Sequence, residues 1–282
     1  MEKIVIFSDG AGDIPPEIVE KYNVQQMYGV ITIDGTEYID KVEISPALMF
    51  DLAKETKSLP KTSAVNIGSY NEGFKPFIDE GYGIVVINIS NKISMCYHNA
   101  LTASKEYEGV YVVDSLSLSS GLAHLVIEAG EMVNKGMSAK EIYENLIILR
   151  GKVHTSFVLD TLEYMAAGGR CSSITAFGAN LLSIKPCIEM DSAGQLQVMK
   201  KYRGNLSKVI PEYVTDQLTN NPNIRTDKIF ITYSTATTEI VDITREAINS
   251  VAKFENIYET TASCTIATHC GPATLGILYM VE

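Results

Sequence analysis

The sequence predicts an α/β protein with two domains, at residues 1–150 and 151–282. In the first part, apolar strand-like runs alternate with helix-like stretches, which is typical of a parallel sheet covered by helices. After about residue 150 the pattern changes to a hairpin followed by helix, strand and helix, which is typical of a mixed sheet. Hydrophobic residues make up 46% of the 282 residues and charged residues 20%, so a large buried core is expected.

In the first part, short buried runs predict strands, and longer stretches with capping residues predict helices. The strands are expected at residues 3–9, 83–90 and 109–115, and the helices at 17–22, 45–57, 99–107, 119–136 and 138–153. Ser45 is the expected N-cap of the second helix, with Pro46 at its first helical position. Residues 25–40 predict a hairpin with Asp34-Gly35 at its turn.

The second part continues with the same two kinds of signal. Helices are expected at residues 158–169, 206–221 and 237–251, and a strand at 228–234. Residues 185–204 predict two antiparallel strands around the turn 191–194. Gly168 is expected in the position after the last turn of its helix, where glycine is favoured.

Charge and composition argue against several classes of protein. Lys plus Arg is 23 and Asp plus Glu is 34, a net charge of −11, and no basic run is present, which disfavours nucleic acid as a partner. The sequence shows no signal-peptide pattern and no apolar stretch of the ~18 residues that a membrane span requires. The cysteines are odd in number and never spaced as C-x-x-C, which favours reduced thiols. We therefore expect a cytoplasmic protein with no integral membrane association.

Small hydroxyl residues gather where the predicted strands of the first part end. They are Ser8, Ser90, Ser94, Ser115, Ser117, Ser119 and Ser120, with Thr62 and Ser63 ahead of the second strand. Ligands collect beyond the carboxyl ends of parallel strands, and hydroxyls beside helix N-termini suit a carboxylate or a phosphate. Each serine could equally cap its own helix, so the residues alone leave both interpretations open.

The segment "THCGPATLG", residues 268–276, places His269 next to Cys270. No second pair of ligands accompanies Cys264 and Cys270, so no metal site is expected. Neighbours on an extended segment point to opposite sides, so Cys270 is not expected to be activated by His269. We therefore expect no catalytic residue, and interpret His269 as a donor or proton partner for an acidic head group.

The loop "AAGGRCSS", residues 166–173, displays Arg170 after two glycines. One interpretation is a helix C-terminus with a favourably placed cation. The other is a contact with an anion or a partner protein, and the loop by itself does not decide between them.

Taken together, these segments resemble the DegV family of bacterial lipid-binding proteins, which includes the fatty-acid-binding subunits of fatty acid kinase. The segments that carry the resemblance, in chain order, are "SDGAGDIP", "KTSAVNIGSY", "ISNKISMCYHNA", "VDSLSLSSGLAHLV", "YMAAGGRCS", "LLSIKPCIEMDSAGQL" and "THCGPATLG". They extend over nearly the whole chain. The chain departs from the family pattern at Met95-Cys96, where Gly-Thr is usual, which crowds this loop and removes a hydroxyl.

The resemblance implies a two-domain fold with helices on both faces of the first sheet and a ligand site between the domains. It implies a non-catalytic carrier that holds a long-chain fatty acid in an apolar tunnel, with no other cofactor, for phospholipid metabolism. By position, the carboxyl group would meet Thr62, Ser63, Ser94, His269 and the backbone N–H of Met95. Arg170 and Arg203 would lie at the pocket mouth or contact a partner, which would be a separate ATP-dependent kinase subunit that forms acyl phosphate.

Two other functions stay open on the sequence. One is a binding protein for another acidic, lipid-like small molecule. The other is an enzyme that uses Ser94 with His269, for which no third, orienting group can be identified.

Overall fold

The fold is taken from a computed structural model, which describes residues 2–176, 184–221 and 223–282. A parallel sheet has the strand order β2-β1-β6-β7. These strands are β1 (Lys3–Asp9), β2 (Gln25–Met27), β6 (Tyr82–Asn88) and β7 (Val110–Asp114). The inner strands are continuous apolar runs because both faces of the sheet are covered, as parallel sheets require.

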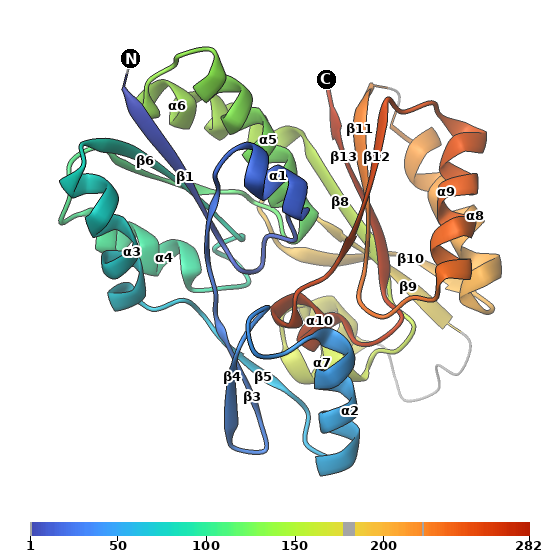
Figure 1. Ribbon diagram of the computed structural model, residues 1–282. Helices are drawn as coiled ribbons and strands as arrows, with labels where there is room; N and C mark the ends of the chain where they lie inside the picture. Colours follow the sequence, from blue (N-terminus) through green and yellow to red (C-terminus); the bar gives the residue numbers. More distant parts are fainter. Residues whose placement is uncertain (1, 177–183, 222) are drawn as a thin grey trace.

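Helices cover both faces of this sheet, as predicted. They are α1 (Pro16–Lys21), α3 (Ile67–Asp79), α4 (Cys96–Ser104), α5 (Ser120–Asn134) and α6 (Ala139–Leu149). Figure 1 shows α3 and α4 on one face of the sheet, with α5 and α6 on the other. Glu141 completes a capping box with Ser138 at the start of α6, which explains why the local sequence located this helix.

The second sheet is mixed and has the strand order β10-β9-β8-β13-β11-β12, with only β11 and β12 parallel among its neighbours. Its strands are β8 (Val153–Val158), β9 (Ile184–Met190), β10 (Leu196–Arg203), β11 (Ile224–Tyr233), β12 (Asn256–Thr261) and β13 (Leu275–Val281). Helices α8 (Leu206–Thr219) and α9 (Thr238–Val251) pack on it, and Figure 1 shows them together on its outer face. The predicted α/β class with a parallel and a mixed sheet is confirmed.

A small third sheet, β4-β3-β5, stands apart from the other two at the bottom of Figure 1. Its strands are β3 (Val30–Ile33), β4 (Thr36–Ile39) and β5 (Lys61–Ser63), and α2 (Pro46–Thr56), α7 (Glu163–Gly168) and α10 (Cys264–Cys270) lie around it. The hairpin predicted over residues 25–40 is confined to β3 and β4, joined at Asp34-Gly35, because residues 25–27 form β2 of the parallel sheet. Ser45 caps α2, with its hydroxyl accepting from the N–H of Leu48, as predicted.

Three local predictions were wrong. Residues 153 and 158 were predicted as helix ends and no strand was predicted between them, but residues 153–158 form β8, a central strand whose partners are distant in sequence. The helix predicted over 158–169 is only α7, and Gly169 rather than Gly168 has the left-handed backbone that ends it. The segment around His269 is not extended, because residues 264–270 form α10, whose N-cap is Ser263.

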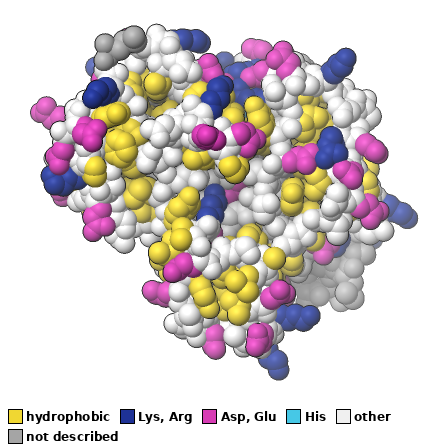
Figure 2. Space-filling view, in the orientation of Figure 1, with side chains coloured by type: hydrophobic (Ala, Val, Ile, Leu, Met, Phe, Trp, Pro, Cys, Tyr) yellow, Lys and Arg dark blue, Asp and Glu magenta, His cyan; other side chains and the backbone are white. Residues whose placement is uncertain are grey.

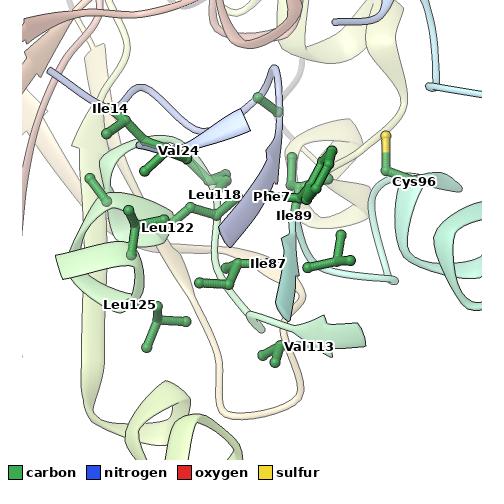
Figure 3. Packing of buried hydrophobic residues seen from close by; sticks show 14 of the residues in the cluster. Phe7, Ile14, Val24, Ile87, Ile89, Cys96, Val113, Leu118, Leu122 and Leu125 are labelled. Carbon is green, nitrogen blue, oxygen red and sulfur yellow. The ribbon is translucent and has the colours of Figure 1, made fainter. Parts of the chain in front are cut away.

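One apolar cluster connects the two larger sheets. It contains residues of the parallel sheet and α5 together with Phe157, Phe230 and Leu278 of the mixed sheet. Figure 3 shows part of it, with Leu118 and Leu122 near the start of α5. The strands of the parallel sheet all precede residue 150 and those of the mixed sheet all follow it. The division into domains at 1–150 and 151–282 stays a prediction.

The net negative charge is not gathered on one patch of the face shown in Figure 2, where Asp and Glu side chains are dispersed among Lys and Arg. Among the described helices, none combines the length and the apolar character that crossing a bilayer requires.

Candidate functional site

A cavity of about 280 Å³ lies where the loops of the parallel sheet meet α7, α10 and β5. Most of its wall is apolar. The apolar side chains that line it are Ala11, Ala64, Val65, Ile89, Ile93, Met95, Leu118, Met165, Leu196 and Ile266. An apolar cavity of this kind, with a few convergent polar groups, is the usual form of a small-molecule site.

The polar part of the cavity wall includes Thr62 and His269, which are 207 residues apart in sequence. The Thr62 hydroxyl and His269 Nε2 are joined by a hydrogen bond of 2.9 Å. Thr62 stands on β5 of the small sheet, and His269 on the last turn of α10. The structure therefore brings together two residues that the sequence assigned to one head-group site.

His269 has a free hydrogen-bonding atom beside this contact. Its Nδ1 is buried and has no hydrogen-bond partner among the described residues. Burial, and secondarily the positive Arg170, lower the pKa of His269 from its ordinary value to about 4. The imidazole is therefore neutral at pH 7, and an anion placed beside it would favour the charged form.

Gly168, the last residue of α7, makes room for this imidazole. A Cβ atom at Gly168 would lie 2.3 Å from His269 Nδ1, closer than any real contact allows. The sequence assigned Gly168 a role in ending its helix, but the neighbouring Gly169 has that role. The requirement for a small residue at 168 comes from a side chain about 100 residues away, which no local pattern shows.

The other predicted head-group residues line the same cavity. Ser63, Ser94 and Met95 are all part of its wall. The Ser94 hydroxyl accepts a hydrogen bond of 3.2 Å from the N–H of Cys96, at the start of α4. Met95 precedes this helix, and its side chain is 56% exposed at the cavity wall.

The two predicted arginines differ in their placement. Arg170 is an exposed residue that lines the cavity and donates a 2.6 Å hydrogen bond to the carbonyl of Gly168. A second pocket on the outer side of the Thr62–His269 pair is also lined by Arg170, together with Lys61 and Tyr164. Arg203 is exposed at the end of β10 and is not among the residues that line the cavity, so its role stays a prediction.

Most of the serines near the strand ends have neither of the two roles considered from the sequence, which were to cap their own helix or to bind an acidic ligand. Ser117 bonds Thr155 and Ser120 bonds Thr232, which joins the first sheet's loops to the mixed sheet. Ser119 donates to Asp13. These hydroxyls bond across the fold rather than point into the cavity, and the sequence could not separate them from Ser94 because all are small hydroxyl residues between a strand end and a helix start.

The cysteines of the cavity wall are not nucleophiles in this state. Burial raises the pKa of Cys96 and of Cys270 to about 12, so both thiols are protonated at neutral pH and serve as apolar wall. Cys270 is thus part of the cavity wall. No group of three or more His, Cys, Asp or Glu side chains suited to a metal ion occurs within residues 2–176, 184–221 and 223–282.

Comparisons with known proteins show which family the chain resembles along its length. A model of the DegV family, described as "Uncharacterised protein, DegV family", matches residues 3–282. A DegV domain-containing protein of Clostridium perfringens is 30% identical over 290 residues, which cover 99% of this chain and 98% of that protein.

The fold is similar to that of several solved proteins. A DegV lipid-binding protein from Thermotoga maritima aligns with a TM-score of 0.86 at 25% identity over 99% of each chain. A DegV family protein from Thermus thermophilus, solved as a study of fatty acid binding, aligns with a TM-score of 0.89 at 24% identity, covering 99% of this chain and 100% of that one. A stearic acid-binding protein from Eubacterium ventriosum aligns at 0.81 with 24% identity, over 100% of this chain and 98% of that one.

Proposed function

This chain belongs to the DegV family, and from that premise we propose that it binds a long-chain fatty acid in the cavity. The observation that carries the proposal is a mostly apolar cavity of about 280 Å³ whose wall includes the hydrogen-bonded pair Thr62 and His269. Several structural neighbours of the chain are fatty-acid-binding DegV proteins. In this proposal the carboxyl group is held by Thr62, Ser94 and His269, with Ser63 and the N–H of Met95 beside them.

The physical chemistry of the ligand fits the two ends of the cavity. Each buried methylene contributes ~0.8 kcal/mol, so a ~16-carbon chain supplies on the order of 10 kcal/mol before the costs of binding. A carboxylate buried without donors would cost several kcal/mol, and the hydroxyls and imidazole offset that cost. An acid with an alkyl chain uses both ends, whereas a small polar acid uses only one.

In the same proposal the protein is a carrier without catalysis of its own. His269 is bonded to Thr62 and, among the described residues, to no carboxylate that could orient it as a base. A separate ATP-dependent kinase subunit would phosphorylate the bound carboxylate in the cytoplasm to form acyl phosphate. Arg170, exposed at the cavity and at the outer pocket, is placed to meet such a partner, and Arg203 is the second proposed contact.

Mass spectrometry of denatured, freshly purified protein tests the ligand directly. We expect a co-purified saturated or unsaturated acyl carboxylate, and submicromolar binding of added oleate or palmitate. The protein alone should not convert the bound acid. A preparation that carries no acyl ligand and binds neither acid would exclude a fatty-acid carrier.

The pKa of His269 provides a second test. Bound oleate is expected to raise the pKa of His269 above its value of about 4, because a carboxylate favours the imidazolium. The complex then holds more protons than the free protein, so oleate affinity should increase as the pH falls from 7 towards the raised pKa. The histidine Cε1–H resonances, followed against pH with and without oleate, measure this shift.

His124 is the internal control for this titration. Burial also lowers the pKa of His124 to about 4, but its Nε2 is bonded to the carbonyl of Leu278 and the residue does not line the cavity. Its resonance should therefore not respond to oleate. Oleyl alcohol, which has the same chain without a charge, should leave His269 unchanged. Equal responses of both histidines to oleate would contradict the proposed position of the carboxyl group.

A further inference from the structure

Helix α10, which carries His269, is attached at its other end to the carboxylate of Asp40. The N–H of Cys264 donates to Asp40 Oδ1 at 2.9 Å, and the N–H of Thr265 donates to Oδ2 at 2.8 Å. The Thr265 hydroxyl donates to the same Oδ2 at 2.6 Å. Asp40 is fully buried and directly follows β4. The two carboxylate oxygens therefore hold two successive residues of the helix.

We propose that Asp40 is a positioning residue of the head-group site, which sets the rotation and depth of α10 and thereby where His269 meets Thr62. Asp40 touches neither the cavity nor a bound carboxyl group in this proposal, since it is not part of the cavity wall. Its effect on ligand binding rests on the proposed function. Its effect on the position of His269 does not depend on the proposed function.

Residues on or next to the strands of the small sheet hold α10 at both ends. Asp40 follows β4, β4 pairs with β3, and β3 pairs with β5, which carries Thr62. One end of α10 is bonded to Asp40 and the other, through His269, to Thr62. Cys264 and His269 are about 7.5 Å apart along the helix axis at ~1.5 Å per residue. A displacement at one end of so short a rigid helix reaches the other end.

The apolar contacts of α10 fix its location but are less directional than its hydrogen bonds. Cys264 and Ala267 pack in an apolar cluster with Ile31, Ile44 and Met49. Apolar packing tolerates small rotations, whereas the first N–H groups of a helix need acceptors at defined positions. Asp13 contributes one further acceptor, for the N–H of Ser263 at 2.7 Å. Carboxylates from the N-terminal part of the chain thus specify the orientation of a C-terminal helix.

The variant Asp40→Asn tests this role with almost no change in shape. An amide retains one acceptor oxygen and turns an NH₂ group towards the donors of Thr265, so the helix must rotate or shift. Asp34→Asn is the matched control, because Asp34 is exposed at the turn of the same hairpin. In Asp40→Asn we expect the His269 Cε1–H resonance of the ligand-free protein to move, and oleate affinity to fall about tenfold. Affinity for oleyl alcohol should change less than twofold, and Asp34→Asn should match the wild type in every measurement.

A folded Asp40→Asn protein with an unchanged His269 resonance and unchanged oleate affinity would overturn the proposal. Equal losses of affinity for oleate and oleyl alcohol would also overturn it, because they indicate general damage to the cavity. If Asp40→Asn does not fold, Thr265→Val and Thr265→Ser replace it. The His269 resonance should move in Thr265→Val, which lacks the hydroxyl bonded to Asp40, and not in Thr265→Ser. If the wild type binds no oleate, the proposed function fails and the ligand-free resonance alone decides the role of Asp40.

Discussion

Gly168→Ala is expected to weaken oleate binding about 30-fold, or ~2 kcal/mol, while the protein stays folded. The added methyl group would lie 2.3 Å from His269 Nδ1 and 3.3 Å from its Cγ and Cε1 atoms, so the imidazole must leave its position. That movement breaks the 2.9 Å bond to Thr62 and removes a donor from the carboxyl group. Alanine is a better helix former than glycine, so the substitution should not destabilise α7 itself.

Gly169→Ala is the matched control for this variant. Gly169 has φ of 67° and nothing within 4 Å of an added Cβ, so the substitution strains the backbone without touching His269. We expect a loss of about 1 kcal/mol in the free energy of unfolding, with oleate affinity within about twofold of the wild type. Calorimetric titration measures the oleate affinity of both variants, and thermal unfolding measures their stability. Wild-type affinity in Gly168→Ala would mean that His269 does not hold the ligand.

Phe230→Ala is expected to produce the largest loss of stability, about 4 kcal/mol in the free energy of unfolding. Phe230 is fully buried on β11. Its ring stacks on Tyr258 at 5.0 Å and meets the edge of His124 on α5 at 4.7 Å. The substitution opens a cavity where α5 packs against the mixed sheet, and the neighbours can fill it only in part.

Urea unfolding followed by circular dichroism measures this loss, and the melting temperature should fall by roughly 10 °C. Phe254→Ala is the control of the same chemistry, because Phe254 is only partly buried at the edge of the second apolar cluster. It should cost about 1 to 2 kcal/mol, since partial burial loses less apolar area. Similar losses in the two variants would show that the contact of α5 with the mixed sheet is not a main source of stability.

Much of the fold could be predicted because the relevant signals are local. Ser45 caps α2 through the N–H of Leu48, three residues on, and Asp34-Gly35 turns the hairpin between adjacent strands. The apolar runs predicted at 3–9 and 83–90 correspond to the inner strands of the parallel sheet, β1 and β6. Caps, turns and strand patterns depend on side chains within a few residues of one another, so a single sequence contains them.

The errors occurred where long-range contacts decide the backbone. β8 lies between β9 and β13 of the mixed sheet. Its apolar pattern therefore fits a buried strand as well as a buried helix. α10 is short and is held at its start by Asp40, 224 residues earlier. The apolar pattern of seven residues is too weak to predict a helix whose formation depends on such distant contacts.

For the site, the residue types could be read from the sequence, and the resemblance predicts the head-group residues Thr62, Ser63, Ser94, Met95 and His269. The sequence by itself also determined an acidic α/β chain with no basic run. The tertiary structure alone decided that Thr62 bonds His269, that His269 is neutral, that Gly168 makes room for it and that Ser117 and Ser120 face other parts of the fold. The physical reason is that burial, pKa and hydrogen-bond partners depend on which distant segments meet, and these meetings are made by packing rather than by neighbours in the chain.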